Sequence, residues 1–305
     1  MTEEMAAVFI GSTLRLAMPL VLAATGELVS ERAGVLNMSV EGMMLTAAFG
    51  AAIGSWATGS PIAGLAIGVL AAMPVALLQA WLSITLRANQ IVTGIGINIL
   101  VLGTTTVAYR EILGRHSRTQ IPGLEKWAPP GLGDLAVWGD AVFRQTWMLY
   151  AGFVLVLIVA WVLRHAAIGL AVRAVGAGPR AVDKSGLSVA AVRYGAVMFT
   201  GVMAALAGCF LSIGDIHTFT EGMTNGAGYL ALAAVIFGNW RIGRTLLACL
   251  LFGAATALQF QLPAMGVQVP TALLIMLPYL LALIAVGGLM GRQTAPAFLT
   301  RAYMR

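Results

Sequence analysis

Charged residues are scarce in this sequence and absent from long parts of it. Asp, Glu, Lys and Arg make up 10% of its 305 residues, against about 25% in ordinary soluble domains. Apolar residues make up 59%, and the mean hydropathy is +0.89. A water-soluble fold of this length cannot bury so much apolar surface, which excludes a soluble enzyme, a nucleic-acid-binding protein and a disulfide-rich secreted module. The stretches without any of these four residue types are 43–86, 88–109, 145–163, 194–214, 222–240 and 245–291.

Cysteine, lysine and histidine are also rare. Cys209 and Cys249 both lie in uncharged stretches, which indicates core residues rather than a disulfide framework. Neither Lys126 nor Lys184 stands in a GxxxxGK[ST] loop, so the chain lacks this route to ATP hydrolysis. The three histidines are too scattered for a metal-ligand motif. We therefore expect no catalytic residue, no metal site and no cofactor bound by this chain.

The uncharged stretches predict membrane-spanning helices. About 20 apolar residues cross a bilayer as a helix, which satisfies its own backbone hydrogen bonds in lipid. We expect an all-α, polytopic transmembrane bundle with about nine spans, forming one domain over residues 1–305. The seventh span is too short for a full crossing at about 1.5 Å per residue, so we expect it to be tilted, partial or re-entrant. The expected spans are 6–26, 38–58, 62–84, 90–110, 145–164, 193–213, 226–239, 245–261 and 269–289.

The connections predict which side each end of the bundle faces. The connection 165–192 carries Arg173, Arg180 and Lys184, with Asp183 as its one acidic residue. Because cytoplasmic loops are rich in Lys and Arg, we expect this connection in the cytoplasm. Counting spans from it puts the C-terminus in the cytoplasm and the acidic N-terminus outside. The connection of about 111–144 then forms an external loop, and its prolines, tryptophans and mixed charge predict an irregular cap.

A polar cluster lies between the first two expected spans, in the string GELVSERAGVLNMSVEGMM (26–44). Polar groups at membrane depth are costly unless they face protein or water. We expect this segment to bend into the bundle, with Asn37 and Glu41 lining a solute path. A structural alternative is that Asn37 caps the second helix, Glu41 lies in its positive first turn, and Arg32 pairs with a nearby glutamate.

A second polar set lies in NQIVTGIGINIL (89–100). Gln90, Thr93 and Asn98 are amides and a hydroxyl, which suit a neutral solute that forms hydrogen bonds; interhelical hydrogen bonding is the alternative. Ion-coupled carriers commonly place ionisable residues deep in the bundle, and the long uncharged spans have none. Arg15 is the one charged residue well inside an expected span. It could serve the path, pair with Glu27 or reach the interface.

The connection 165–192 contains a short predicted helix. In GLAVRAVGAGPRAVDKSGLSVAAVR (169–193), Pro179 suits a helix start and Gly186 follows its end. A helix of roughly two turns would put Arg180, Asp183 and Lys184 on one polar face. Such a helix could be a solvated loop element or could dock into a groove on a partner.

Four strings together resemble a known family. They are SERAGVLNMSVEGMM (30–44), NQIVTGIGINIL (89–100), GLAVRAVGAGPRAVDKSGLSV (169–189) and GMTNGAGYLALAAVIFGNW (222–240). The chain resembles permease subunits of ATP-binding-cassette (ABC) importers of the branched-chain amino acid, ribose and nucleoside type. Within that type it is similar to nucleoside and simple-sugar permeases. Two departures are Ala177-Gly178, where family members tend to have Glu-Asn, and Ser39, where Gly is usual.

The resemblance implies a type II importer permease fold in the bacterial inner membrane. It also implies three partners: a related second permease in a heterodimer, cytoplasmic ABC ATPase subunits that use ATP and Mg, and an extracytoplasmic substrate-binding lipoprotein. The family's coupling helix lies in the string 169–189, which implies that the ATPase contacts Pro179, Arg180, Asp183, Lys184 and Gly186. The expected function is ATP-driven import of a neutral polar solute, a nucleoside above all. The rivals are a self-sufficient secondary carrier or channel, and a non-transporting assembly subunit.

Overall fold

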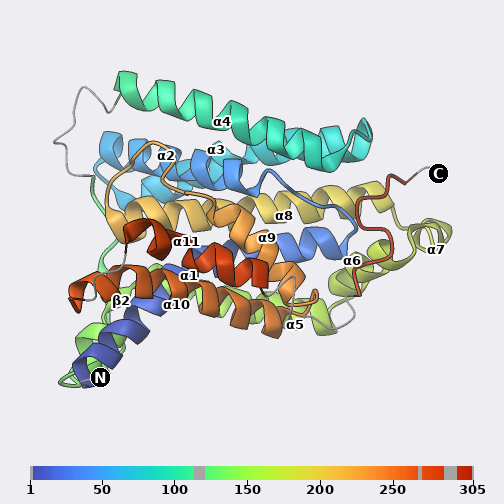
Figure 1. Cartoon of the computed structure of the whole chain (residues 1–305). Helices are drawn as coiled ribbons and strands as arrows, with labels where there is room; N and C mark the ends of the chain where they lie inside the picture. Colours follow the sequence, from blue (N-terminus) through green and yellow to red (C-terminus); the bar gives the residue numbers. More distant parts are fainter. Residues whose placement is uncertain (1–2, 113–120, 267–269, 285–293, 304–305) are drawn as a thin grey trace.

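The computed structural model describes residues 3–112, 121–266, 270–284 and 294–303. Figure 1 shows the long helices stacked roughly along one direction, with the N-terminus at one end of the bundle and the C-terminus at the other. The helical segments are apolar on all faces, so several of the helices bury side chains on more than one side. Much of the main hydrophobic core comes from α1 (Glu3–Arg32), α2 (Val40–Thr58) and α8 (Val189–Cys209), and α10 (Ile242–Ala264) packs against α1.

Six helical stretches are long and apolar enough to cross a membrane. Two of them continue past an α-helix as a π-helix: α3 (Pro61–Ala80) into η1 (Trp81–Thr85), and α8 into η4 (Phe210–Ile216). The six stretches are Glu3–Arg32, Pro61–Thr85, Gln90–Ile112 (α4), Trp147–His165 (α5), Val189–Ile216 and Ile242–Ala264.

The other three expected spans are helices too. They are α2 (Val40–Thr58, 19 residues), α9 (Ala227–Phe237, 11 residues) and α11 (Thr271–Ile284, 14 residues). The expectation that the seventh span is short is confirmed by α9. Residues 285–289 of the ninth expected span lie outside the described residues. The fold is therefore a polytopic helical bundle, in which six of the nine expected spans meet the length and composition of a full crossing.

Small residues let α2 and α3 approach closely. A Cβ added at Gly68 would lie 2.5 Å from Cys209 Sγ and 2.7 Å from the Ala47 carbonyl oxygen. Both cysteines are buried and unbonded, as expected for core residues. Close backbone contact of this kind stabilises membrane helices, which gain little from the hydrophobic effect among themselves.

The two ends of the bundle differ in structure. One end carries α6 (Ala167–Ala177), α7 (Pro179–Lys184) and the C-terminal residues, as Figure 1 shows. At the other end the expected irregular cap is confirmed within residues 121–146. It contains β1 (Lys126–Trp127) paired antiparallel with β2 (Gln145–Thr146), and the turn η3 (Gly139–Phe143). This two-residue pairing is the one departure from an all-α fold in the described part of the chain.

Candidate solute path and coupling surface

The helix stops between α1 and α2, over residues 33–39, and Figure 1 shows α2 starting part-way along the bundle. Side chains of α1 and of α4 accept hydrogen bonds from the backbone N–H groups of this break. Glu27 Oε1 accepts a hydrogen bond from the Asn37 N–H at 2.8 Å, and Gln90 Oε1 accepts one from the Leu36 N–H at 2.8 Å. Lipid offers no hydrogen bonds, so such partners are needed wherever a helix breaks inside a membrane protein.

Asn98 joins this break to two further elements. Its Oδ1 accepts from the Gly42 N–H at 2.9 Å, in the first turn of α2. Its Nδ2 donates to the Met38 carbonyl oxygen at 2.8 Å and to the Tyr229 hydroxyl at 2.7 Å, on α9. One buried amide therefore fixes α4, the start of α2 and the start of α9 relative to one another.

Asn37 is fully buried and organises the turn before α2. Its Oδ1 accepts from both the N–H (3.1 Å) and the hydroxyl (2.7 Å) of Ser39. Ser39, and not Asn37, is the N-cap residue of α2, so the alternative in which Asn37 caps the helix is wrong. The departure at Ser39 supplies a hydroxyl that Gly would lack.

Glu41 lies in the first turn of α2 and binds the start of α9. Its Oε1 accepts from the Thr224 hydroxyl at 2.6 Å and the Gly226 N–H at 2.8 Å, and its Oε2 accepts from the Gly228 N–H at 2.7 Å. A carboxylate is stabilised at the positive N-terminal end of a helix. A Cβ at Gly228 would lie 2.6 Å from the Glu41 backbone nitrogen, so the two helix starts need glycine to approach this closely.

The structure brings together four of the five predicted path residues, and Thr93 is the exception. Asn37, Glu41, Gln90 and Asn98 all bind residues 33–42 or the α9 start through the hydrogen bonds above. Thr93 is half-buried, and its hydroxyl donates to carbonyl oxygens of its own helix, at Asn89 (3.0 Å) and Gln90 (3.3 Å).

Two tyrosines near this network were missed by the sequence reasoning. Tyr229 receives the hydrogen bond from Asn98, and the Tyr279 hydroxyl of α11 donates to the Asn225 carbonyl oxygen at 2.7 Å. Both side chains are exposed, and Tyr279, Asn225 and Thr224 line a cavity of about 150 Å³. The available signal was the string TNGAGY, where glycines precede a hydroxyl-bearing aromatic residue in an uncharged stretch.

The isolated charges resolve into specific contacts. Arg15 Nε lies 3.3 Å from Asp215 Oδ1, a partner that none of its three expected roles included, because Asp215 is brought near α1 by η4. Arg32 Nε donates to the Trp240 carbonyl oxygen at 2.9 Å, so its expected pairing with a glutamate is wrong. Within the described residues no group of three His, Cys, Asp or Glu could hold a metal ion.

The short helix predicted in the connection 165–192 is confirmed as α7. It begins at Pro179 and ends at Lys184, and Gly186 follows with φ of 89°, a left-handed conformation that suits glycine. Arg180 and Lys184 are exposed, whereas Val182 is buried against α6 and α8. Asp183 is half-buried and lines a cavity beside α7.

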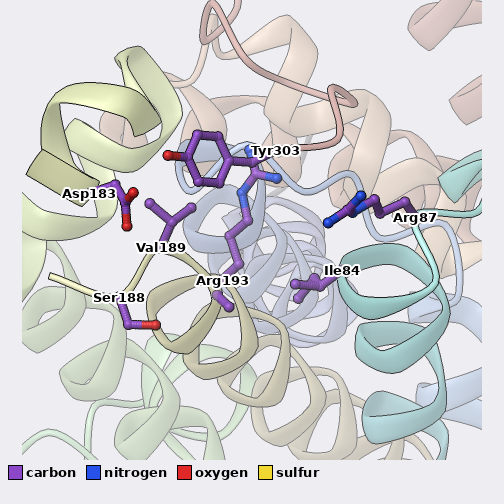
Figure 2. A pocket seen from close by; sticks show the side chains of 8 residues that line it. Ile84, Arg87, Asp183, Ser188, Val189, Arg193 and Tyr303 are labelled. Carbon is purple, nitrogen blue, oxygen red and sulfur yellow. The ribbon is translucent and has the colours of Figure 1, made fainter. Parts of the chain in front are cut away.

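Asp183 lines a cavity of about 250 Å³ together with Arg87, Arg193 and Tyr303 (Figure 2). Arg193 comes from the first turns of α8 and is buried. Its Nε donates to the Ala33 carbonyl oxygen at 3.2 Å, where α1 has ended, and its Nη1 donates to the Arg301 carbonyl oxygen at 3.1 Å. The cavity beside α7 is therefore connected by one side chain to the helix break of the path network.

The family model for "Branched-chain amino acid transport system / permease component" matches residues 9–286 of the chain. The chain belongs to this permease family. The permease is 33% identical over 303 residues to the guanosine ABC transporter permease protein NupQ of Bacillus subtilis, covering 96% of this chain and 95% of NupQ. It is 30% identical over 301 residues to the nucleoside ABC transporter permease protein NupC of Lactococcus lactis, covering 95% and 94%.

A third relative is the proposed glucose ABC transporter permease protein TsgC13 of Haloferax volcanii. It is 36% identical over 260 residues, covering 84% of this permease and 78% of TsgC13. No solved structure is significantly similar to the permease. The family and the apolar helices make the permease a multi-pass membrane protein and not an enzyme.

Proposed function

We propose that this permease is the membrane subunit of an ATP-driven importer of nucleosides. The observation that carries the proposal is the 33% sequence identity to a guanosine permease over 96% of the chain. A nucleoside permease is 30% identical over 95% of the chain. A nucleoside is neutral and carries hydroxyl and amine groups. The amide and hydroxyl groups around the start of α9 match that chemistry.

The proposed path follows the meeting point of α2 and α9. Broken helices in transporters often end at the solute, because a helix start presents free N–H groups and partial positive charge. Here Glu41 and Asn98 occupy those groups, so their role is to fix the two helix starts. Asn37 and Gln90 hold the break in the same way, and Thr93 extends the polar surface of α4. The side chains of Tyr229 and Tyr279 are exposed beside this network, and their hydroxyls contact the solute.

The proposed coupling route starts at α7. Cytoplasmic ATPase subunits, which bind ATP and Mg²⁺, dock on Arg180 and Lys184, while Pro179 and Gly186 bound the helix and Asp183 faces the adjoining cavity. Closure of the ATPase pair moves α7, and Arg193 transmits the movement to residue 33 and the break. Alternation between two states of the bundle then carries the solute.

The remaining partners follow from the family type. A related second permease completes the path, and an extracytoplasmic lipoprotein delivers the solute to the end that carries β1 and β2. The protein lies in the bacterial inner membrane with α7 in the cytoplasm, since Arg and Lys gather at that end. Single cysteines at Lys184 and Glu125, without Cys209 and Cys249, test this orientation. An impermeant thiol reagent labels only the Glu125 position in intact cells, and labelling at Lys184 would overturn it.

Competition in uptake tests the solute class. Cells that express the whole importer take up labelled guanosine, and unlabelled nucleosides compete with it while glucose does not. Glucose is the informative competitor because TsgC13 shares 36% identity with the chain. If unlabelled glucose inhibits the uptake as strongly as unlabelled guanosine does, the solute is a sugar and not a nucleoside. A second control is an importer without this permease, which should accumulate no label.

A further inference from the structure

A strongly basic cavity lies between the end of α1, the end of α5, the start of α10 and the middle of α6. Its volume is about 600 Å³. Four arginines line it: Arg32 ends α1, Arg164 lies in the last turn of α5, Arg173 lies within α6, and Arg241 immediately precedes α10. None of the coupling residues of α7 contributes to it.

No acidic residue lines this cavity. The nearest carboxylate in sequence, Glu31, accepts a hydrogen bond from the Trp240 indole N–H and is buried. Arg164 and Arg241 are exposed and have no carboxylate partner in the described part of the chain. Four guanidinium groups thus share one cavity, and no carboxylate of the described residues pairs with them, an arrangement that an anion would stabilise.

The geometry of the donors suits a phosphate group. A guanidinium presents its N–H groups as a planar fork that binds two phosphate oxygens at once. Arg32 already donates to the Trp240 carbonyl oxygen, which fixes its position at the inner wall. Arg164, in the last turn of α5, and Arg241, just before α10, are the two that keep their donors available.

The surroundings match a lipid headgroup. Trp161 lines the cavity one turn before His165, is 61% exposed, and its ring is stacked with that of His165 at 5.9 Å between centroids. Tryptophan is enriched where membrane helices meet the headgroup region. Along α5, Leu157 is 66% exposed and would lie beside the acyl chains. Basic pockets between membrane helices are known to bind anionic headgroups.

We propose that this cavity binds the phosphate of an anionic phospholipid at the membrane boundary. The lipid joins α5, α6 and the start of α10 to Arg32, the last residue of α1 before the helix break at residue 33. The site is separate from the solute path and from α7, and the proposal holds whether or not the solute is a nucleoside.

Native mass spectrometry of the purified full-length permease tests the site. The protein in detergent is titrated with dioleoylphosphatidylglycerol, with dioleoylphosphatidylcholine and with inorganic phosphate. We expect it to retain phosphatidylglycerol at least about tenfold more tightly than phosphatidylcholine. The double variant R164Q/R241Q loses this preference, and R164K/R241K keeps most of it because the charges remain. The matched control R244Q alters an exposed arginine of α10 that does not line the cavity and should bind like the native protein.

Four outcomes would overturn the proposal. One is equal retention of phosphatidylglycerol by R164Q/R241Q and R244Q when both unfold at the native temperature. Another is equal retention of the two lipids by the native protein. If inorganic phosphate displaces phosphatidylglycerol at equal concentration, the cavity is a free-phosphate site. If R164Q/R241Q keeps the lipid but no longer co-purifies with the ATPase subunits, the arginines form a protein-docking surface.

Discussion

Arg193 Nε donates a hydrogen bond to the Ala33 carbonyl oxygen at 3.2 Å, and the two residues are 160 positions apart in the chain. Ala33 is the first residue after α1, and Arg193 is one turn into α8, beside the cavity that Asp183 of α7 also lines. This bond connects the cavity beside the proposed ATPase-docking surface directly to the proposed solute path. It makes Arg193 the residue through which the coupling account is most easily tested.

Replacing Arg193 with Gln should uncouple ATP hydrolysis from uptake. The change removes charge-assisted hydrogen bonds to Ala33 and Arg301, each worth about 1.5–3 kcal/mol. We expect guanosine uptake to fall at least about tenfold while the ATPase rate of the purified complex stays near the native value. The control R87Q changes an exposed arginine of the same cavity. Coupled, native-level uptake by R193Q would remove this bond from the mechanism.

Charge reversal on α7 should disturb the docking of the ATPase. Arg180 and Lys184 are exposed on this helix, and like or unpaired charges at a protein contact cost on the order of 1 kcal/mol or more. In R180E/K184E we expect the two permeases to assemble, and the ATPase to bind weakly or to hydrolyse ATP without moving solute. Measurements are ATPase retention, stimulation by the binding protein, and uptake. The control R244E reverses an exposed charge on α10. Normal values for all three would leave α7 as a solvated loop helix.

Replacing Asn98 with Leu should impair transport by loosening the helix break. The Gly42 N–H and the Met38 carbonyl would each lose a partner, at a cost of about 1–3 kcal/mol for a buried group. We expect reduced uptake, a lower unfolding temperature, and a complex that still assembles and hydrolyses ATP. N37L and Q90L should act in the same direction. T104V, on the same helix, removes a hydroxyl bonded only within α4 and should change little. Native uptake in all three Leu variants would exclude this network from the path.

Replacing Gly228 with Ala should separate the starts of α2 and α9. The new Cβ would meet Glu41 backbone atoms at 2.6–2.7 Å, where overpacking costs about 1–3 kcal/mol. The control G103A adds a Cβ with no atom within 4 Å, in the interior of α4, and should be neutral or stabilise the helix by up to about 1 kcal/mol. The unfolding temperature and uptake of both variants are compared. A G228A variant as stable and active as G103A would contradict the close contact of these helix starts.

Much of the fold could be predicted because lipid imposes a local rule on sequence. In lipid, each uncharged stretch must form its own backbone hydrogen bonds, so composition alone predicts helices. This holds for the short stretch that forms α9 as well. Pro179 and Gly186 predicted α7 because their backbone preferences act within a few residues. The two-residue strands at Lys126 and Gln145 carry no such signal, since two residues have no periodicity.

The site could be predicted only in part, because its contacts connect distant segments. Asn37, Glu41 and Asn98 were recognised as costly polar groups in apolar surroundings. Their partners were not, since Glu41 binds Thr224, 183 positions away. The sequence leaves Arg15 three possible roles, and none of them includes its partner in the structure, Asp215 of η4, which is distant in the chain. Arg193 is the first residue of the expected span 193–213, and no local feature of the sequence indicates that it is buried.

ATP-driven import of nucleosides by this permease can be measured directly in proteoliposomes. Vesicles are made with the complete importer, enclosed ATP and Mg²⁺, and external binding protein with labelled guanosine. We expect guanosine to accumulate above its external concentration. The accumulation should be lost with a non-hydrolysable ATP analogue and should be unaffected by ionophores that collapse ion gradients. Accumulation by this chain alone, driven by an ion gradient without ATP, would contradict ATP-driven import and establish a secondary carrier.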